Sequence, residues 1–168
     1  MISRDIVVIA HDIRSTHNVG SLLRTCEGLG ISKVYLTGYT PYPALPQGDS
    51  RLPHIAQKLT AQIHKTALDA ETLVPWEHSD GIAACIARLR ADGYAIAGLE
   101  QSERSTPLHK FAPPGKIAVL LGREVEGIDP TVLALCDMHI EIPMLGRKES
   151  FNVVQAAAMA LYHLRFGK

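Results

Sequence analysis

The chain has 168 residues, of which 46% are hydrophobic and 20% are charged, and its formal net charge at pH 7 is zero. This apolar content excludes a natively disordered chain and predicts one domain over residues 1–168 with a core of its own. Zero net charge excludes nucleic-acid binding through bulk charge alone. No apolar run approaches the length of a membrane span.

The cysteines and histidines predict a reduced protein without a metal site. Cys26, Cys85 and Cys136 are odd in number and far apart, and none forms a Cys-x-x-Cys pair. We therefore expect free thiols, a cytoplasmic location and no zinc site. The eight histidines are scattered, and no two stand at i, i+4 with a glutamate between them, so none is predicted to bind a metal.

The N-terminal third predicts a strand, a helix and a second strand. Residues 5–10 form the continuous apolar run of a buried strand, and a polar loop over 11–17 follows. Asn18 is expected to cap a helix that ends near Gly28. The next strand covers 33–38, so the two strands should be parallel. One face of the helix carries the apolar positions Val19, Leu22, Leu23, Cys26 and Leu29.

The middle of the chain begins with a proline-rich segment. Residues 39–53 contain four prolines and predict a mobile loop, either a plain connector or a flap over a substrate. A short helix is expected over 54–65 and a short strand over 72–76. Residues 80–92 carry a clear helical periodicity, and 94–99 follow as a strand.

The C-terminal third alternates in the same way. A strongly apolar strand over 116–121 leads through a loop over 122–127 to a helix that begins at Asp129-Pro130. Residues 138–143 form the last strand, and an apolar helix over 153–166 follows. Such alternation is typical of an α/β fold, a mostly parallel sheet with helices on both faces.

Ligands bind beyond the carboxyl ends of parallel strands. The loops there are 11–18, 100–107, 122–128 and 144–152, and they hold the polar candidates. Each candidate has a structural alternative: helix caps for Asn18 and Asn152, and ordinary surface polarity for the others, which are Arg24, Glu124 and Ser150.

Three segments together resemble the motifs of the SpoU/TrmH branch of the SPOUT methyltransferases. They run from Asn18 to Thr25, from Leu121 to Ile128 and from Ile142 to Val153. The chain departs from the family pattern at Phe151, where leucine is usual, and at 123–125, where a small residue and glycine usually flank the glutamate. Neither departure removes a polar residue that the chemistry needs.

The resemblance implies a parallel sheet whose C-terminal segment is threaded into a deep trefoil knot. It also implies S-adenosylmethionine as the cofactor and a homodimer with the apolar helix 153–166 at its interface. The positions that correspond to cofactor-binding residues of the family are Leu99, Gly122, Ile142, Met144 and Phe151.

By the same resemblance the reaction is methyl transfer to a ribose 2′-hydroxyl of RNA. Arg24 would contact the RNA and either accept the hydroxyl proton or act by charge alone, because arginine is a poor base. Asn18 would orient Arg24 or the ribose, while Ser150 and Asn152 would position Arg24 and the target nucleotide. Glu124 would support the pocket.

Transfer RNA is favoured over ribosomal RNA because small family members often act on it, and zero net charge leaves room for an accessory protein in RNA recognition. Three alternatives stay open. One is a catalytically silent RNA-binding or assembly protein with the same fold, although Arg24 and Asn152 are both present. The others are an enzyme acting on a small nucleotide and a methyltransferase acting on a base nitrogen.

Overall fold

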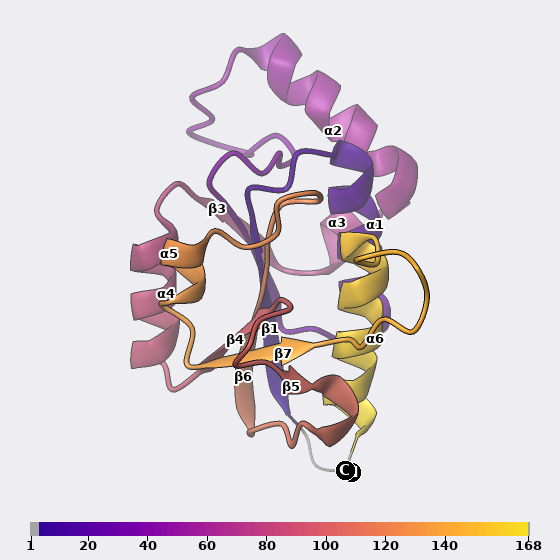
Figure 1. Cartoon of the computed structure of the whole chain (residues 1–168). Helices are drawn as coiled ribbons and strands as arrows, with labels where there is room; N and C mark the ends of the chain where they lie inside the picture. Colours follow the sequence, from indigo (N-terminus) through magenta and orange to yellow (C-terminus); the bar gives the residue numbers. More distant parts are fainter. Residues whose placement is uncertain (1–3, 168) are drawn as a thin grey trace.

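One parallel sheet organises the chain in the computed structural model, which describes residues 4–167 (Figure 1). Within these residues the sheet has seven strands in the order β3-β2-β1-β6-β4-β7-β5, and every neighbouring pair is parallel. The predicted α/β class is therefore confirmed. The strands are β1 (Asp5–His11), β2 (Lys33–Thr37), β3 (Trp76–Ser79), β4 (Ala95–Leu99), β5 (Thr106–Pro107), β6 (Lys116–Leu121) and β7 (Met138–Glu141).

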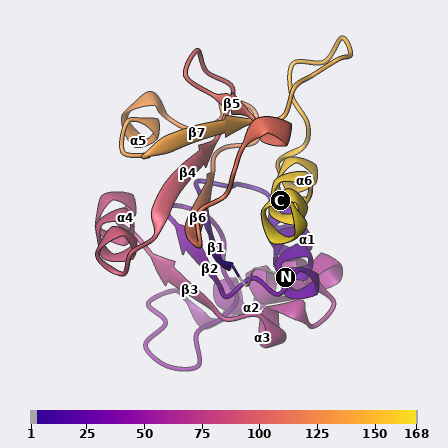
Figure 2. The same ribbon diagram turned by 90° about the horizontal axis from the view of Figure 1, so that it is seen from below.

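Helices cover both faces of this sheet, as the view from below shows (Figure 2). Helices α1, α2, α3 and α6 lie on one face, and α4 and α5 lie on the other. No helix within residues 4–167 combines the length and the apolar character needed to cross a bilayer. The helices are α1 (Thr16–Gly28), α2 (Pro53–Ala67), α3 (Ala70–Leu73), α4 (Ile82–Ala91), α5 (Pro130–Leu133) and α6 (Val153–Phe166), with a 3₁₀ turn at Leu108–Lys110.

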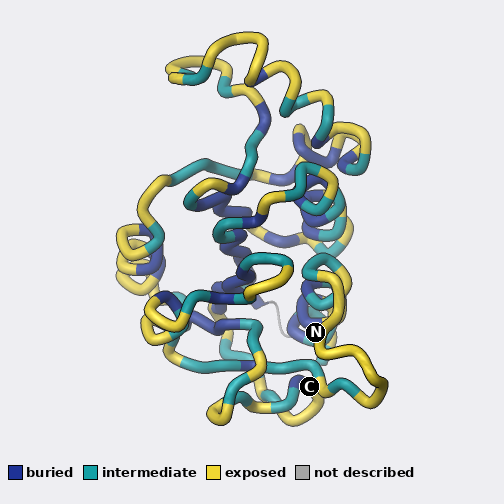
Figure 3. Tube along the Cα trace, turned by 45° about the horizontal axis from the view of Figure 1, so that its top comes forward, coloured by how far each residue is buried: buried dark blue, intermediate teal, exposed yellow. Residues whose placement is uncertain are grey.

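The continuous apolar run of β1 is explained by its central place in the sheet. Ile6 and Val8 face the core that contains α1 and α6, while Val7 and Ile9 face the core that contains α4. Side chains alternate along a strand, so a strand covered on both faces needs an apolar residue at every position. In Figure 3 the trace through the middle of the sheet is dark blue, the colour of buried residues.

Two predicted boundaries are wrong. Ser15, not Asn18, caps α1: its hydroxyl accepts a hydrogen bond from the backbone N–H of Asn18 at 3.2 Å, and the helix begins at Thr16. Serine is as strong a cap as asparagine, and the earlier cap leaves the Asn18 side chain free for other contacts. The strand predicted over 72–76 is instead the edge strand β3, because residues up to Leu73 belong to α3.

Arg51 holds the loop over 39–53 together from within. Its guanidinium forms hydrogen bonds to Asp49 Oδ1 at 2.8 Å and to the carbonyl oxygens of Tyr42 and Pro43 at 2.8 and 3.0 Å. It also lies 3.6 Å from the centre of the Tyr42 ring, which stacks on His78 of β3. The stack ties this exposed loop to the edge of the sheet. The predicted mobility of the loop stays a prediction.

We expect Arg51→Ala to loosen this loop while the rest of the fold is kept. The substitution removes the hydrogen bonds that close the loop, and it leaves the Asp49 carboxylate without its main partner. Limited proteolysis with mass mapping should show cleavage within 39–53 several-fold faster than in the wild type. Lys58→Ala, which removes one exposed charge from α2, is the control. Equal cleavage rates in the wild type, Arg51→Ala and Lys58→Ala would contradict the proposed role of Arg51 in closing the loop.

Candidate active site

Two loops meet at the carboxyl end of the sheet because the strands before them are neighbours. Ala10 of β1 lies opposite Leu121 of β6 in the parallel register, so the segment before α1 and the loop over 122–128 leave the same edge side by side. Glu124 joins them. Its Oε1 accepts hydrogen bonds from the Ser15 backbone N–H at 3.0 Å and from Asn18 Nδ2 at 3.2 Å, and its Oε2 accepts one from the Arg14 backbone N–H at 3.2 Å.

Asn152 brings the third segment to the same place. Its Nδ2 lies 3.4 Å from Asn18 Oδ1, a long hydrogen bond, and its Oδ1 accepts the Val154 backbone N–H at 2.9 Å. The cap role at α6 and the contact with Asn18 are therefore both present in one side chain. The structure thus connects Glu124, Asn18 and Asn152, which come from three distant parts of the chain.

The Glu124 carboxylate is held in its ionised form. Partial burial raises its pKa, but the hydrogen bonds from the backbone N–H groups of Ser15 and Arg14 outweigh burial and place the pKa below its ordinary value. Glu124 is therefore an anionic anchor at neutral pH and does not carry a proton there.

This anchor predicts a pH-dependent loss of stability in Glu124→Gln. The folded-state pKa is lowered, so the stabilisation is complete above the ordinary pKa of 4.5 and is lost as the pH falls through the lowered value. We expect the variant to lose about 1 kcal/mol of unfolding free energy at pH 7, at the low end for a charged acceptor because the site is partly exposed. Urea unfolding at pH 7 and in acid should show this difference shrinking toward zero. Glu103→Gln removes an exposed carboxylate elsewhere as the control, and a constant difference across pH would contradict the anchor role.

A pocket of about 150 Å³ lies beside this network. It is formed by the ends of β4, β6 and β7, the loop over 122–128 and the start of α6. Five of the predicted site residues line it, namely Leu99, Glu124, Ile142, Ser150 and Phe151. The whole lining combines apolar side chains with four carboxylates and one cation, Arg123.

Gly122 and Met144 lie outside the lining of this pocket. Gly122 instead allows the loop to fold back on itself: a Cβ atom there would lie 2.5 Å from both the carbonyl carbon of Gly127 and the backbone nitrogen of Ile128. The turn is closed by two backbone hydrogen bonds of 3.1 Å between Arg123 and Gly127. Met144 is half-buried in the segment after β7. Gly122 therefore shapes the loop that carries Glu124.

Arg24 and Ser150 are not joined to the network. The Arg24 side chain is exposed on α1, and no residue within 4–167 forms a hydrogen bond or an ion pair with it. Ser150 is exposed at the pocket, and within the same range its hydroxyl has no hydrogen-bonding partner. Both side chains are therefore free to contact a ligand.

Glu100 is a site residue that was not predicted. Its Oε2 accepts the Ile128 backbone N–H at 2.8 Å and its Oε1 accepts the Gln101 backbone N–H at 3.0 Å, so it fixes the loop over 122–128 against the end of β4. A glutamate that directly follows a buried strand was the available signal. The donors from Arg14 and Ser15 are backbone groups, which a sequence pattern does not reveal.

Known proteins resemble this chain over most of its length. Residues 50–162 match the model of the SpoU rRNA Methylase family. The chain is 28% identical over 151 residues to the 23S rRNA (guanosine-2′-O-)-methyltransferase RlmB of Acinetobacter baylyi, covering 89% of this chain and 55% of that protein. It is 28% identical over 160 residues to the tRNA (guanosine(18)-2′-O)-methyltransferase of Borreliella burgdorferi, covering 93% and 64%. The chain thus spans less than two thirds of these relatives.

Solved structures share the fold. The TrmH/SpoU tRNA modifying enzyme of A. aeolicus superposes with a TM-score of 0.79 at 21% identity, over 99% of this chain and 77% of that one. The AdoMet-bound rRNA methyltransferase of Sinorhizobium meliloti gives 0.78 at 18%, over 96% and 56%. A structure described for 2-OH methylation of C/U34 on tRNA gives 0.75 at 22%, over 98% and 97%. All three identities are below 25%, so these likenesses establish the fold.

Proposed function

Because the chain belongs to the SpoU rRNA Methylase family, we propose that it transfers a methyl group from S-adenosylmethionine to a ribose 2′-hydroxyl in structured RNA. The observation that carries the proposal is the connection of Glu124, Asn18 and Asn152 beside the pocket. The two curated relatives are named as RNA 2′-O-methyltransferases, one for tRNA and one for rRNA.

The pocket fits S-adenosylmethionine by its chemistry. Leu99, Ile142 and Phe151 offer apolar surface to an adenine ring, and the carboxylates of Glu100 and Glu124 suit a cationic sulfonium. These residues would hold the cofactor, while Met144 stays a predicted contact. S-adenosylmethionine supplies an electrophilic methyl group when it is bound. The solved relative from Sinorhizobium meliloti is described as AdoMet-bound.

The protein's own side chains would contribute to the reaction by positioning the target nucleotide and by charge. Asn18 is held by Glu124 at 3.2 Å and by Asn152 at 3.4 Å, and from this position it would orient Arg24 or the ribose. Ser150 and Asn152 would position the target nucleotide at the mouth of the pocket. The exposed Arg24 guanidinium would contact the RNA, and it would act on the ribose hydroxyl either as proton acceptor or by charge alone.

We also propose a class of RNA substrate and an oligomeric state for this protein. Transfer RNA is favoured because a structure concerned with tRNA matches over nearly its whole length. A homodimer through α6 is supported by the large side chains that α6 leaves exposed, Met159, Tyr162 and Phe166.

We also propose that residues 1–168 form one methyltransferase domain with a trefoil knot. Zero net charge is compatible with an accessory protein in RNA recognition.

The test is transfer of labelled methyl from S-adenosylmethionine to unmodified transcripts of tRNA and of rRNA. The product is digested and analysed for 2′-O-methylnucleosides. Alkali-resistant label at one linkage in one RNA class would support the reaction and name its substrate. Absence of label and of S-adenosylhomocysteine binding would overturn the proposal and favour a catalytically silent RNA-binding protein. If no label is transferred but S-adenosylhomocysteine still binds, the assay would be repeated with other RNAs and with a partner protein.

A further inference from the structure

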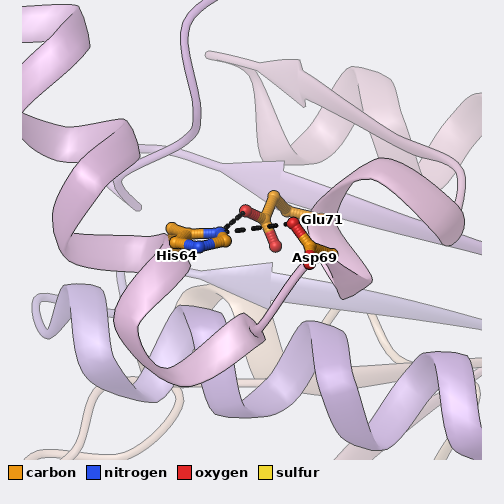
Figure 4. Close-up of side chains that lie close together, drawn as sticks. All are labelled: His64, Asp69 and Glu71. Atoms are coloured by element: carbon orange, nitrogen blue, oxygen red, sulfur yellow. Dashed lines mark hydrogen bonds and ion pairs between the residues drawn. The ribbon is translucent and has the colours of Figure 1, made fainter.

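A histidine and two carboxylates converge where α2 turns into α3 (Figure 4). His64 lies in the last turn of α2, and Glu71 lies in α3. Leu68 and Asp69 both have positive φ, 50° and 74°, and this turn brings Asp69 back beside His64. His64 Nδ1 lies 2.7 Å from Glu71 Oε1 and 3.7 Å from Asp69 Oδ1, and one ligand atom from each residue lies within 4.8 Å of the others.

Glu71 gives this cluster a buried polar atom without a partner. Its side chain is only 7% exposed, and within residues 4–167 its Oε2 atom is buried and forms no hydrogen bond. Figure 4 shows the Glu71 carboxylate projecting between the His64 ring and Asp69. Burying a carboxylate oxygen with no donor is costly, and native proteins rarely leave one in this state. The part of the chain that the structure describes therefore supplies neither a donor nor a cation to Oε2.

We propose that His64, Asp69 and Glu71 bind a divalent first-row transition-metal ion, with Zn²⁺ as the representative. One imidazole nitrogen and two carboxylate oxygens are ligands that Zn²⁺ commonly takes. Mg²⁺ is a poor match because it prefers oxygen ligands throughout. His64 is 50% exposed and Asp69 is 77% exposed, so the remaining coordination positions face solvent and would hold water.

A simple ion pair explains the cluster less well than a metal ion does. A protonated His64 brings one positive charge to two carboxylates, and its Nδ1 already faces Oε1 of Glu71. It therefore leaves Oε2 without a partner. A divalent ion balances both carboxylates and can bind Glu71 through either oxygen, while His64 releases its proton to solvent and binds as neutral imidazole.

The proposed metal site would have a structural role. None of the three residues lines the pocket, but the elements they join support α1. The Thr66 hydroxyl donates a hydrogen bond to the His17 carbonyl oxygen at 2.8 Å, and Trp76 Nε1 donates one to the Glu71 carbonyl oxygen at 2.9 Å. A bound ion would tie α2 to α3, and both pack against the helix that carries Asn18 and Arg24.

Calorimetric titration of the full chain with ZnCl₂, paired with thermal unfolding, tests the proposal. We expect one high-affinity Zn²⁺ per chain and a zinc-dependent rise in Tm, with no rise in MgCl₂. Asp69→Asn, His64→Gln and Glu71→Gln should each weaken this binding by at least about tenfold. Asp69 is exposed, and asparagine tolerates positive φ, so Asp69→Asn keeps the fold even where Glu71→Gln does not.

Asp80→Asn is the matched control. It removes a carboxylate that lies 2.9 Å from the ring of His78, a histidine–carboxylate pair that no third ligand residue joins within residues 4–167. Wild-type zinc affinity in this variant, with loss in the other three, supports the site. Equal affinity in the wild type and Asp69→Asn, or no zinc-dependent rise in Tm, overturns it. An anomalous zinc peak in crystals of the wild type must lie among the three side chains, and a peak elsewhere also overturns the proposal.

Discussion

Arg24→Ala is expected to abolish detectable methyl transfer, a loss of at least about 10²-fold in kcat, while the Kd for S-adenosylmethionine changes by no more than a few-fold. The reason lies in the position of Arg24. Its side chain is exposed on α1, no residue within 4–167 holds it, and it does not line the pocket. Its removal would therefore take away the proposed contact with the RNA and leave the lining of the proposed cofactor pocket unchanged.

Single-turnover methyl transfer and calorimetric titration with S-adenosylhomocysteine measure the two quantities separately. Lys110→Ala, which removes one exposed cation outside the site, is the control for general charge. Arg24→Lys keeps the charge and loses the planar guanidinium, so partial activity in that variant would favour a purely electrostatic role. Loss of cofactor binding in Arg24→Ala would show that the proposed role of Arg24 is wrong.

The strands could be predicted because their signals are local. β1 and β6 sit in the middle of the sheet and are apolar at nearly every position, so their sequences differ plainly from the flanking loops. The sequence prediction misplaced β3 because this strand lacks a local signal. It is an edge strand with four half-buried residues, and its polar His78 and Ser79 give no apolar pattern. Only its pairing with β2 defines it as a strand.

The candidate site could be predicted in its residue types but only partly in its contacts. Asn18, Glu124 and Asn152 were expected together because their motifs follow strands that end at one edge. Asn18 was also expected to cap α1, and the structure assigns that cap to Ser15. Glu124 accepts hydrogen bonds from the Ser15 backbone N–H and from the Asn18 side chain, so the Asn18 amide is engaged across more than one hundred residues while the Ser15 hydroxyl caps the helix.

The cluster of His64, Asp69 and Glu71 could not be predicted from the sequence. Metal motifs are recognised by regular spacing on one helix or in tight loops, and these three residues follow neither pattern. They meet because two consecutive residues that are not glycine, Leu68 and Asp69, adopt positive φ. Few sequences signal that conformation, since bulky residues adopt it rarely.

Gly122→Ala is expected to raise the Kd for S-adenosylmethionine by at least about tenfold and to lower the unfolding free energy by about 1–3 kcal/mol. The added Cβ would lie 2.5 Å from the backbone of both Gly127 and Ile128. Backbone atoms cannot rotate out of the way as a side chain can, so the loop over 122–128 must move. That movement would draw Glu124 away from Ser15 and Asn18.

Cofactor titration and urea unfolding measure the two effects. Gly115→Ala is the control because, among the described residues, no atom outside its chain neighbours lies within 4 Å of a Cβ at that glycine. The two readouts must change together if the loop both closes the pocket and holds Glu124. A variant that loses stability but binds S-adenosylmethionine like the wild type would show that the loop shape does not determine the pocket. The cofactor would then depend on the strand ends at Leu99 and Ile142, and the role of Gly122 would be confined to folding.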